Sequence, residues 1–380
     1  MPKILFVATV VKTHIMQFHI PYLEMFHQMG WETSVAARND YENPEDCVIP
    51  YCDVFYNIPF ERSPFHIKNI QAYQKIKTIL DQNTYSIIHC HTPVGAALTR
   101  LAAKDSRKNG TKIFYTAHGF HFYKGAPFLN WLIYYPVEYM LASFTDVLIT
   151  INQEDYRRAQ HFKAKKVYYI PGVGIDTGKF CRSQQAIPEK RKELGFEPDD
   201  FIILSVGELI YRKNHQAVLK ALSMLRHHPE FSRIHYILCG SGKLESKLKR
   251  LSHSLKIADH VHFLGYQNDM AGIYQCCDLF VFMSFQEGLP VALMEAMGCG
   301  LPVICSKIRG NIDLVQNNVN GMLIENKIPQ IAFGIKELLT NKEKRTAMGI
   351  AGQMRIQKLD QSKICRLMRN LYLKEVKREG

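Results

Sequence analysis

Short apolar runs alternate with helix-like stretches through most of the chain, a pattern typical of parallel α/β domains. The first half is expected to hold strands at residues 4–11, 33–37, 87–89, 112–116 and 146–151, with helices at 19–29 and 96–104. The second half is expected to hold strands at residues 201–206, 234–239, 260–264, 279–283 and 302–305, with helices at 215–225, 244–251 and 290–297. Two successive series predict two doubly wound domains, in which ligands bind beyond the carboxyl ends of the strands.

Residues 179–200 separate the two series and look like a linker, because they are rich in charge and contain Pro188, Gly195 and Pro198. We expect three parts: an N-terminal domain of residues 1–178, a C-terminal domain of residues 179–360, and a C-terminal helix of residues 361–380, for which a crossing back to the first domain is left open. Helical spacing over residues 342–377 predicts one apolar stripe, made of Ile364, Leu367, Met368 and Leu371.

Composition narrows the class of protein. Hydrophobic residues make up 47% of the 380, which is enough to bury a sizeable core. The 48 basic side chains exceed the 35 acidic ones by 13, which favours an anionic partner: nucleic acid, an acidic membrane face or a phosphorylated small substrate. Ten scattered cysteines without a CxxC pair argue against a disulfide scaffold. No apolar stretch reaches the ~18–20 residues of a membrane span, so we expect a cytoplasmic protein, either soluble or peripheral on the cytoplasmic membrane.

The loop after the predicted strand 201–206 has the chemistry of an anion site. It begins at Gly207 and carries Arg212 and Lys213 just ahead of a helix that Asn214 is expected to cap. Arginine can bind two phosphate oxygens at once, and lysine adds a compact charge. An ordinary polar loop is the alternative.

The segment after strand 279–283 predicts a second anion site at a helix start. Pro290 suits the first turn of a helix, so the backbone N–H groups of Gly288, Leu289 and Val291 are expected to be free to bind a diphosphate. Glu287 lies in the loop, and Glu295 lies in the second turn of that helix, where a carboxylate could accept hydrogen bonds from a ribose. A solvated face is the usual place for a helical glutamate, but the neighbours of Glu295 look buried: Ala292, Leu293, Ala296 and Met297.

These residues resemble a known signature. Glu287 and Glu295 have seven residues between them and are followed by Ala-Met-Gly-Cys-Gly-Leu-Pro-Val, which resembles the E-x7-E signature of family-4 retaining glycosyltransferases of the GT-B fold. The segments around Arg212-Lys213-Asn214 and Gly240-Ser-Gly242 agree with that family. In the first half, residues 115–127 and 169–176 resemble its bacterial exopolysaccharide and capsule branch, so that the resemblance spans nearly the whole chain.

The resemblance implies an α/β protein of GT-B type, with two doubly wound Rossmann-like domains that face a central crevice. It matches Arg212 and Lys213 to the diphosphate-binding pair and Glu287 to the carboxylate near the donor sugar. It also matches Glu295 to the group that binds the nucleotide ribose, and His118 to a histidine at the crevice floor beside the transferred sugar. The segment that contains Gly265 and Tyr266 corresponds to the loop that brackets the base, and Gly207 and residues 288–291 complete the expected donor site.

The turn after the first strand departs from the family pattern. Many members have a glycine-rich turn there, whereas this chain reads Thr-Val-Val-Lys-Thr-His over residues 9–14. Side chains of Lys12, Thr13 and His14 are therefore expected to make contacts on the acceptor side instead.

We expect neither a cofactor nor a required metal. Gly240-Ser-Gly242 begins like a dinucleotide fingerprint but lacks the third glycine, and the chain has no Asp-x-Asp to anchor a metal–diphosphate complex. His118 with His121, and His89 with His91, lack companion ligands at zinc-binding spacing. His89 and His91 lie at a strand end, and we expect hydrogen bonds rather than a metal ion to satisfy their ring nitrogens.

The expected activity is that of a retaining hexosyltransferase. The resemblance suggests a nucleotide diphosphate sugar as the donor, with UDP as the nucleotide. The expected acceptor is a lipid-linked saccharide or an oligosaccharide in surface polysaccharide synthesis. A sugar-nucleotide epimerase of the same fold is the alternative. A basic nucleic-acid-binding protein is disfavoured, because no recognisable module accompanies the charge. Residues 119–141 hold eight aromatic side chains, which predict either core packing or a surface that contacts the inner membrane face.

Overall fold

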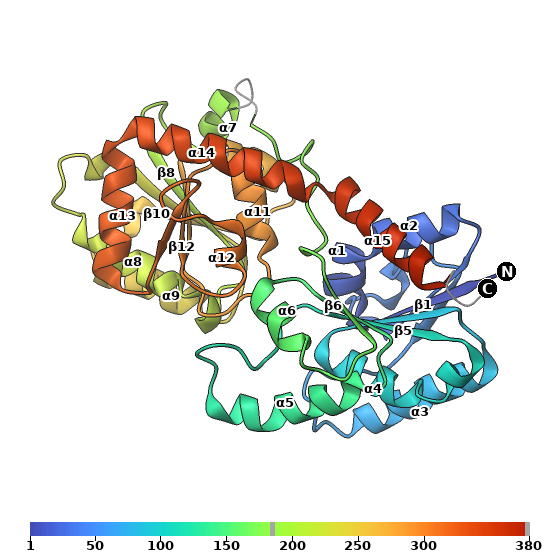
Figure 1. The fold of residues 1–380 in the computed structure, drawn as a ribbon. Coiled ribbons are helices and arrows are strands. Elements are labelled where there is room, and N and C mark those ends of the chain that lie inside the picture. The colour runs from blue at the N-terminus through green and yellow to red at the C-terminus, as the bar shows by residue number, and fades with distance from the viewer. Residues whose placement is uncertain (183–186, 377–380) are drawn as a thin grey trace. The chain divides into compact units, whose positions relative to one another are not determined.

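The two predicted series of strands and helices form two separate parallel sheets, each in its own unit of chain (Figure 1). The computed structural model describes residues 1–182 and 187–376. The first unit comprises residues 1–173 and the described residues from Ile364 onward, and the second comprises the described residues between Gly174 and Lys363. The predicted α/β class with two parallel sheets is confirmed.

The first unit contains a seven-stranded parallel sheet in the order β3-β2-β1-β4-β5-β6-β7. Its strands are β1 (Lys3–Val10), β2 (Glu32–Arg38), β3 (Val54–Asn57), β4 (Ile87–His91), β5 (Lys112–Ala117), β6 (Val147–Thr150) and β7 (Lys166–Tyr169). Its helices are α1 (Met16–Phe18), α2 (Ile20–Gln28), α3 (Lys68–Gln82), α4 (Pro93–Ala102), α5 (Phe128–Ala142), α6 (Gln153–Ala159) and most of α15 (Gln361–Val376).

Both faces of this sheet are buried, which explains why its central strands are apolar without alternation. Successive side chains of a strand point to opposite faces, so β1 contributes to two cores. Leu5 and Val7 belong to one core, and Ile4 and Phe6 belong to the other. The apolar run of β1 that the sequence shows is therefore the signature of a strand covered on both sides.

Helix α15 contributes to the core of the first unit. The side chains of Ile364, Met368, Leu371 and Tyr372 are buried there together with Phe26 and Phe114. Leu367, which the sequence pattern places on the same stripe, has 52% of its surface exposed, and Tyr372 takes its place in the core. Residues 377–380 of the expected C-terminal helix lie outside the described residues.

The second unit contains a six-stranded parallel sheet in the order β10-β9-β8-β11-β12-β13. Its strands are β8 (Phe201–Val206), β9 (Ile234–Cys239), β10 (Val261–Gly265), β11 (Leu279–Phe282), β12 (Val303–Ser306) and β13 (Met322–Ile324). Its helices are α7 (Ile187–Glu193), α8 (His215–Met224), α9 (Glu245–Ser254), α10 (Met270–Cys276), α11 (Val291–Gly298), α12 (Asn311–Leu314), α13 (Ile328–Thr340) and α14 (Lys342–Ile356).

The charged segment expected to be a linker is part of the second unit. Its helix α7 carries Arg191, whose buried guanidinium donates hydrogen bonds to the backbone oxygens of Cys276, Pro198 and Asp200 and to the carboxylate of Asp278. The high charge of this segment therefore includes a buried, fully bonded arginine, which composition alone cannot distinguish from a solvated one.

Of the two glycines in the second half of α14, Gly349 determines how closely that helix approaches the rest of the second unit. A Cβ atom added to Gly349 would lie 2.1 Å from the carbonyl oxygen of Gly300, two residues beyond the end of α11. A Cβ atom added to Gly352, one turn further along, would find its nearest neighbours at 3.7 Å, an ordinary contact. The close approach at Gly349 holds α14 against the helix that bears Glu295.

We predict that Gly349→Ala destabilises the second unit by about 1–3 kcal/mol, because a backbone carbonyl cannot move out of the way of a methyl group without shifting its chain. Gly352→Ala is the matched control and should be neutral or stabilising by up to about 1 kcal/mol, since alanine is the better helix former. Thermal unfolding of both variants beside the wild type measures the difference. Equal melting temperatures for the two variants would contradict the close packing at Gly349.

Candidate active site

The loops at the carboxyl edge of the second sheet bring the predicted donor-site residues together. Gly207 follows β8, and the loop after β11 contains Glu287. The strands β8 and β11 are hydrogen-bonded neighbours in parallel register, so their following loops lie side by side. This is the edge at which doubly wound sheets bind ligands.

Arg212 and Lys213 both contact Glu287. They lie in the short helical turn η4 (Tyr211–Lys213). Lys213 Nζ donates a hydrogen bond of 2.8 Å to Glu287 Oε1, and Arg212 Nη1 lies 3.2 Å from the same oxygen. Two cations and one carboxylate leave a surplus of one positive charge at the sheet edge, which favours an anionic ligand.

The backbone keeps these side chains in place. Arg212 Nη1 also donates to the carbonyl oxygen of Gln286, and the N–H of Phe285 donates to the carbonyl oxygen of Arg212, so the two loops are bonded in both directions. A Cβ atom at Gly207 would lie 3.1 Å from Lys213 Cε, which means that the absence of a side chain there allows the lysine to lie against the strand end. Lys213 is mostly buried, whereas the side chain of Arg212 is 39% exposed.

Asn214 does not cap α8 as the sequence predicts. Its backbone adopts the left-handed conformation with φ of 54°, and its side chain makes no capping hydrogen bond to the helix. Its Nδ2 instead lies 3.3 Å from Asn326 Oδ1. A side-chain cap normally has an extended backbone, which Asn214 lacks, so the predicted cap is wrong, while the positions of the two cations do not depend on it.

The N-terminus of α11 lies in the same region as the cation pair. The helix begins at Val291, with Pro290 as its N-cap, one position later than the pattern predicts. The first N–H groups of a helix have no partner within the helix and are available to a ligand. Gly288 and Leu289 precede the helix, directly after Glu287.

Arg309 is a third cation at this edge that the sequence reasoning missed. It is buried, and its Nε donates a 3.1 Å hydrogen bond to the carbonyl oxygen of Glu287. It follows β12, the strand next to β11, so the rule of inspecting the residues after each apolar run would have found it. No charge pattern in the local sequence distinguishes it from a surface arginine.

Glu295 lies in the second turn of α11, as predicted, and is half-buried, as is Ala292, which the pattern predicts to be buried. Tyr274 OH, which is buried, donates to Glu295 Oε2 at 3.0 Å. The neighbours Leu293, Ala296 and Met297 are completely buried. Burial raises the pKa of Glu295 above its ordinary value, and the hydrogen bond from Tyr274 opposes part of that shift.

Gly265 and Tyr266 lie at the end of the edge strand β10. The carbonyl oxygen of Gly265 accepts a 2.7 Å hydrogen bond from the N–H of Gly240, and Tyr266 is 77% exposed. Gly240 has a φ of +134°, and a Cβ atom there would lie 2.2 Å from the carbonyl oxygen of Gly207. The glycines that resemble a dinucleotide fingerprint therefore permit close contact between loops of this sheet edge.

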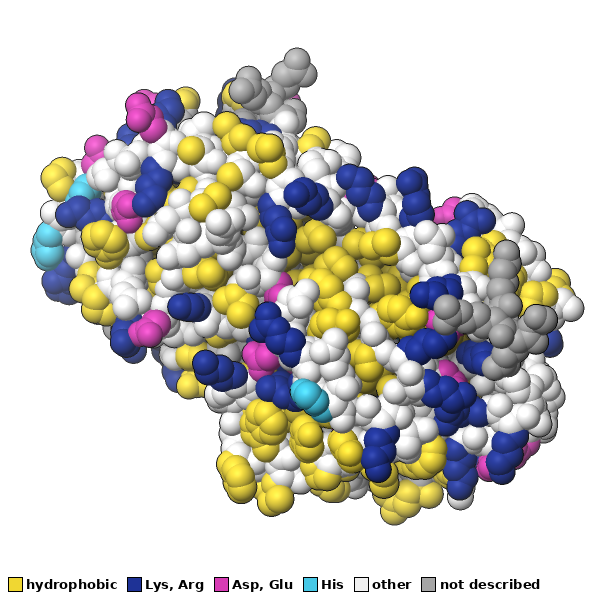
Figure 2. All heavy atoms as spheres, in the orientation of Figure 1, with side chains coloured by type: hydrophobic (Ala, Val, Ile, Leu, Met, Phe, Trp, Pro, Cys, Tyr) yellow, Lys and Arg dark blue, Asp and Glu magenta, His cyan; other side chains and the backbone are white. Residues whose placement is uncertain are grey.

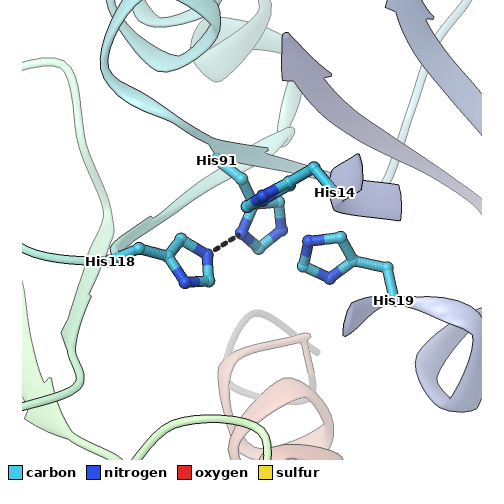
Figure 3. Close-up of side chains that lie close together, drawn as sticks. All are labelled: His14, His19, His91 and His118. Carbon is cyan, nitrogen blue, oxygen red and sulfur yellow. Dashed lines mark hydrogen bonds between the residues drawn. The ribbon is translucent and has the colours of Figure 1, made fainter. Parts of the chain in front are cut away.

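In the first unit, His118 follows β5 and belongs to a cluster of four histidines (Figure 3). His118 Nε2 lies 3.3 Å from His91 Nδ1, and the rings of His14 and His19 lie beside them. Burial lowers the pKa of His118 to about 4, so the imidazole is neutral at physiological pH. The sequence singled out His14, His91 and His118 separately; it missed His19, which it placed at the start of a helix.

The remaining candidate histidines have other roles. His89 is satisfied as predicted, because its ring nitrogens lie 2.6 Å from Tyr372 OH and 2.8 Å from Thr116 Oγ1. His91 differs from this prediction, since its Nε2 has no partner among the described residues. The ring of His121 stacks on Tyr134 with centroids 4.6 Å apart and lies outside the four-histidine cluster.

The chain after β1 forms the π-helical turn η1 (Val11–Ile15). Its three predicted acceptor-side residues, Lys12, Thr13 and His14, do not all face the same way. Lys12 and Thr13 are exposed and contact Asp40: the N–H of Lys12 donates to Asp40 Oδ1 at 2.6 Å. His14 is turned inward. Thr13 and His14 border a cavity of about 460 Å³ within the first unit, whose other polar side chains include Arg62, His121, Tyr134 and Glu138. The sequence analysis did not predict this cavity.

Comparison with known proteins agrees with these observations. Residues 3–152 match the family model described as glycosyl transferase 4-like, and residues 186–355 match the model described as glycosyl transferases group 1. The putative glycosyltransferase EpsD of Bacillus subtilis (strain 168) is 37% identical over 377 residues, which cover 97% of this chain and 96% of that protein. An Escherichia coli galactosyltransferase, named for transfer from UDP-Gal to α-D-GlcNAc-diphosphoundecaprenol, is 30% identical over 68% of this chain and 67% of its own.

Solved structures share the fold. Anabaena HepE in complex with UDP and glucose has a TM-score of 0.81 at 19% identity, covering 98% of this chain and all of that one. WaaG, a glycosyltransferase involved in lipopolysaccharide biosynthesis, has a TM-score of 0.77 at 16% identity, covering 97% and 99%. The order of strands in both sheets, the residues gathered at their carboxyl edges and these similarities lead to one conclusion: the chain belongs to the family-4 glycosyltransferases, has the GT-B fold and is an enzyme that transfers sugars.

Proposed function

We propose that this enzyme transfers a sugar from a UDP-linked donor to a lipid-linked saccharide in the synthesis of a surface polysaccharide. The observation that carries the proposal is the contact of Arg212 and Lys213 with Glu287 beside the N-terminus of α11. Support comes from the UDP bound in the HepE structure and from the name of the E. coli relative, whose acceptor is a diphosphoundecaprenol-linked sugar. The relatives reported above are named for sugar transfer and give no support to an epimerase.

In this proposal, the second unit stabilises the leaving group of the reaction. When the bond between the anomeric carbon and the phosphate breaks, negative charge accumulates on the diphosphate. Arg212, Lys213 and the N–H groups at the start of α11 would stabilise that charge, and they are already fixed before the reaction begins. Stabilisation that is greatest in the transition state lowers the barrier rather than only tightening binding. We expect this sugar transfer to need no divalent cation.

Retention of the anomeric configuration, which is typical of the family, is compatible with two courses. In the first, the acceptor attacks from the same face as the departing phosphate. In the second, Glu287 forms a covalent intermediate. The hydrogen bonds favour the first course, because Glu287 Oε1 accepts from both Lys213 and Arg212, and a carboxylate held by two cations is a weak nucleophile.

We assign Glu295 to binding the ribose of the nucleotide. Its Oε2 accepts from Tyr274 OH, which fixes the carboxylate and leaves its other oxygen for sugar hydroxyls. Gly265 and Tyr266 would bracket the base at the end of β10, and the exposed ring of Tyr266 is free to stack on it.

The acceptor side is proposed in the first unit. The cavity of about 460 Å³ offers Thr13 and His14 to a saccharide and apolar walls to the lipid end of an acceptor. His118, with a pKa of about 4, is too weak a base to be charged at neutral pH. We therefore assign it the role of a neutral hydrogen-bonding group that orients the acceptor or the transferred sugar.

Helix α5 presents an apolar outer face that fits a membrane surface. Its inward side packs Trp131, Tyr135 and Tyr139 against the core, as one of the two sequence alternatives predicts. Its outward side leaves Phe128, Leu129, Leu132 and Met140 exposed, and Figure 2 shows this face as a group of hydrophobic side chains interspersed with basic ones. No helix in the described parts of the chain could cross a bilayer. We propose peripheral attachment to the cytoplasmic membrane face through α5, with the basic surface adding attraction to anionic lipid.

The test of the donor proposal is a panel of UDP-, GDP- and TDP-sugars, assayed for thermal stabilisation and for turnover with a polyprenyl-diphosphate saccharide. We expect a UDP-sugar to give both. Arg212→Ala and Lys213→Ala should each lower kcat by about 10²-fold or more, because each removes part of the charge that stabilises the leaving diphosphate. Lys247→Ala, which removes an exposed cation of α9, is the control and should leave kcat unchanged. Full turnover in both site variants would show that the electrostatic assignment is wrong.

Donor binding should depend on pH through Glu295. Because burial raises the pKa of this carboxyl, it takes up a proton at a higher pH than an exposed glutamate does, and a protonated carboxyl accepts ribose hydrogen bonds poorly. The KM for donor should therefore rise as the pH falls through the raised pKa. Glu295→Gln should raise KM about 10-fold or more at neutral pH with little change in kcat, and should remove this pH dependence. Glu245→Gln on the exposed part of α9 is the control; a wild-type pH profile in the Glu295 variant would refute the ribose assignment.

Membrane attachment can be measured by sedimentation with anionic liposomes at low salt. The double variant Phe128→Ser/Leu132→Ser should lower the partition constant for liposomes by about tenfold or more, because two apolar side chains no longer enter the interface. Met224→Ser/Phe333→Ser removes two similarly exposed apolar side chains from the second unit and should bind like the wild type. If the wild-type protein stays in the supernatant, α5 does not attach the enzyme by itself.

A further inference from the structure

Four histidines from separate parts of the chain meet at the carboxyl edge of the first sheet (Figure 3). His14 lies in η1 after β1, His19 precedes α2, His91 ends β4 and His118 follows β5. The strands β1, β4 and β5 are consecutive in the sheet, which brings their ends together. One ring nitrogen from each histidine lies within 4.8 Å of the others.

Several of these nitrogens lack hydrogen-bond partners. His14 Nε2, His91 Nε2 and both ring nitrogens of His19 are buried and unpaired among the described residues. A buried polar atom without a partner costs about 1–3 kcal/mol, so four of them at one place represent a large unmet demand. His89, two residues before His91 on the same strand, has both of its nitrogens satisfied, which shows that the local packing does not force imidazoles to be unpaired.

A small cavity adjoins the cluster. It measures about 20 Å³ and is bordered by His19, His91 and His118, together with His89, Thr116, Tyr22 and apolar side chains of the first unit. That volume is enough for one particle of about the size of a water molecule and too small for a sugar or a phosphate. At this cavity the unpaired nitrogens of His19 and His91 can be satisfied by a water molecule or a single ion, whereas His14 borders the larger cavity of about 460 Å³ as well.

The ligand set selects the kind of ion. All four groups are imidazoles, with no carboxylate or thiolate among them, and imidazole suits Zn²⁺ and neighbouring transition metals rather than Mg²⁺ or Ca²⁺. Ligands about 2.0–2.1 Å from a tetrahedral Zn²⁺ lie about 3.4 Å from one another. His91 Nδ1 and His118 Nε2 are already 3.3 Å apart. Since all four ligand atoms lie within 4.8 Å of one another, no pair would have to close by more than about 1.4 Å to reach that spacing.

We propose that His14, His19, His91 and His118 form a binding site for one Zn²⁺-type transition-metal ion inside the first unit. The site is assembled by the sheet edge, so residues far apart in sequence supply its ligands. The proposal concerns residues of the first unit alone and uses none of the donor-site residues of the second unit. It gives His14 and His118 a role as metal ligands in place of the direct hydrogen bonds to the acceptor or the transferred sugar proposed above.

The test uses the full-length protein after removal of metal with a chelator. Titration with Zn²⁺ should give one ion per chain, together with a higher melting temperature, since a ligand that binds only the folded state stabilises it. Titration with Co²⁺ should give the intense visible bands of a tetrahedral nitrogen-coordinated ion. His19→Gln should lower Zn²⁺ affinity by more than about tenfold and abolish those bands.

A matched control lies in the second unit. His262 Nε2 and His235 Nδ1 are 3.0 Å apart, so they form another close imidazole pair that could scavenge metal. His262→Gln should keep the stoichiometry and the Co²⁺ spectrum of the wild type. Equal Zn²⁺ affinity in His19→Gln and wild type, or a weak octahedral Co²⁺ spectrum in the wild type, would overturn the proposal. If His19→Gln does not fold, the wild-type stoichiometry and Co²⁺ spectrum decide the question alone.

Discussion

Two cations share a single carboxylate oxygen at the carboxyl edge of the second sheet, and the proposed donor chemistry of this unit depends on that contact. Lys213 and Arg212 come from one loop and Glu287 from another, and the loops are further joined by backbone hydrogen bonds. The arrangement fixes the direction of both cations and leaves one net positive charge. A site that must stabilise charge during a reaction benefits from groups that are oriented beforehand, because reorientation in the transition state would consume part of the gain.

The residues of this site were predictable because its signals are local. The parallel strands β8 and β11 each read as short apolar runs, and the rule that ligands bind beyond strand ends leads directly to Arg212, Lys213 and Glu287. Glu295 was predictable from the apolar flank of its helix. Details that depend on backbone dihedral angles were not: Asn214 has the composition of a cap but a left-handed backbone. Arg309 and Arg191 show the same limit, since a buried arginine and an exposed one look alike in sequence.

The first unit was less predictable because its site is assembled from residues far apart in the chain. His14, His19, His91 and His118 have no spacing in common, and only the order of β1, β4 and β5 in the sheet brings them together. The short strands β3 and β7 also escaped prediction, because they lie at the sheet edges and carry few fully buried residues. A sequence pattern indicates whether a segment is buried. It does not indicate which strand ends become neighbours, and the four-histidine cluster depends on that.

The return of α15 to the first unit makes that unit discontinuous in sequence. Residues 1–173 by themselves lack Tyr372, which packs against Phe26 and Phe114 and hydrogen-bonds to His89. Glu375 of the same helix forms an ion pair with Lys166 on the edge strand β7. The first unit therefore cannot complete this core until α15, which follows the second unit in the sequence, has been synthesised. The second unit is contiguous, so all of its residues are synthesised before the first unit can be completed.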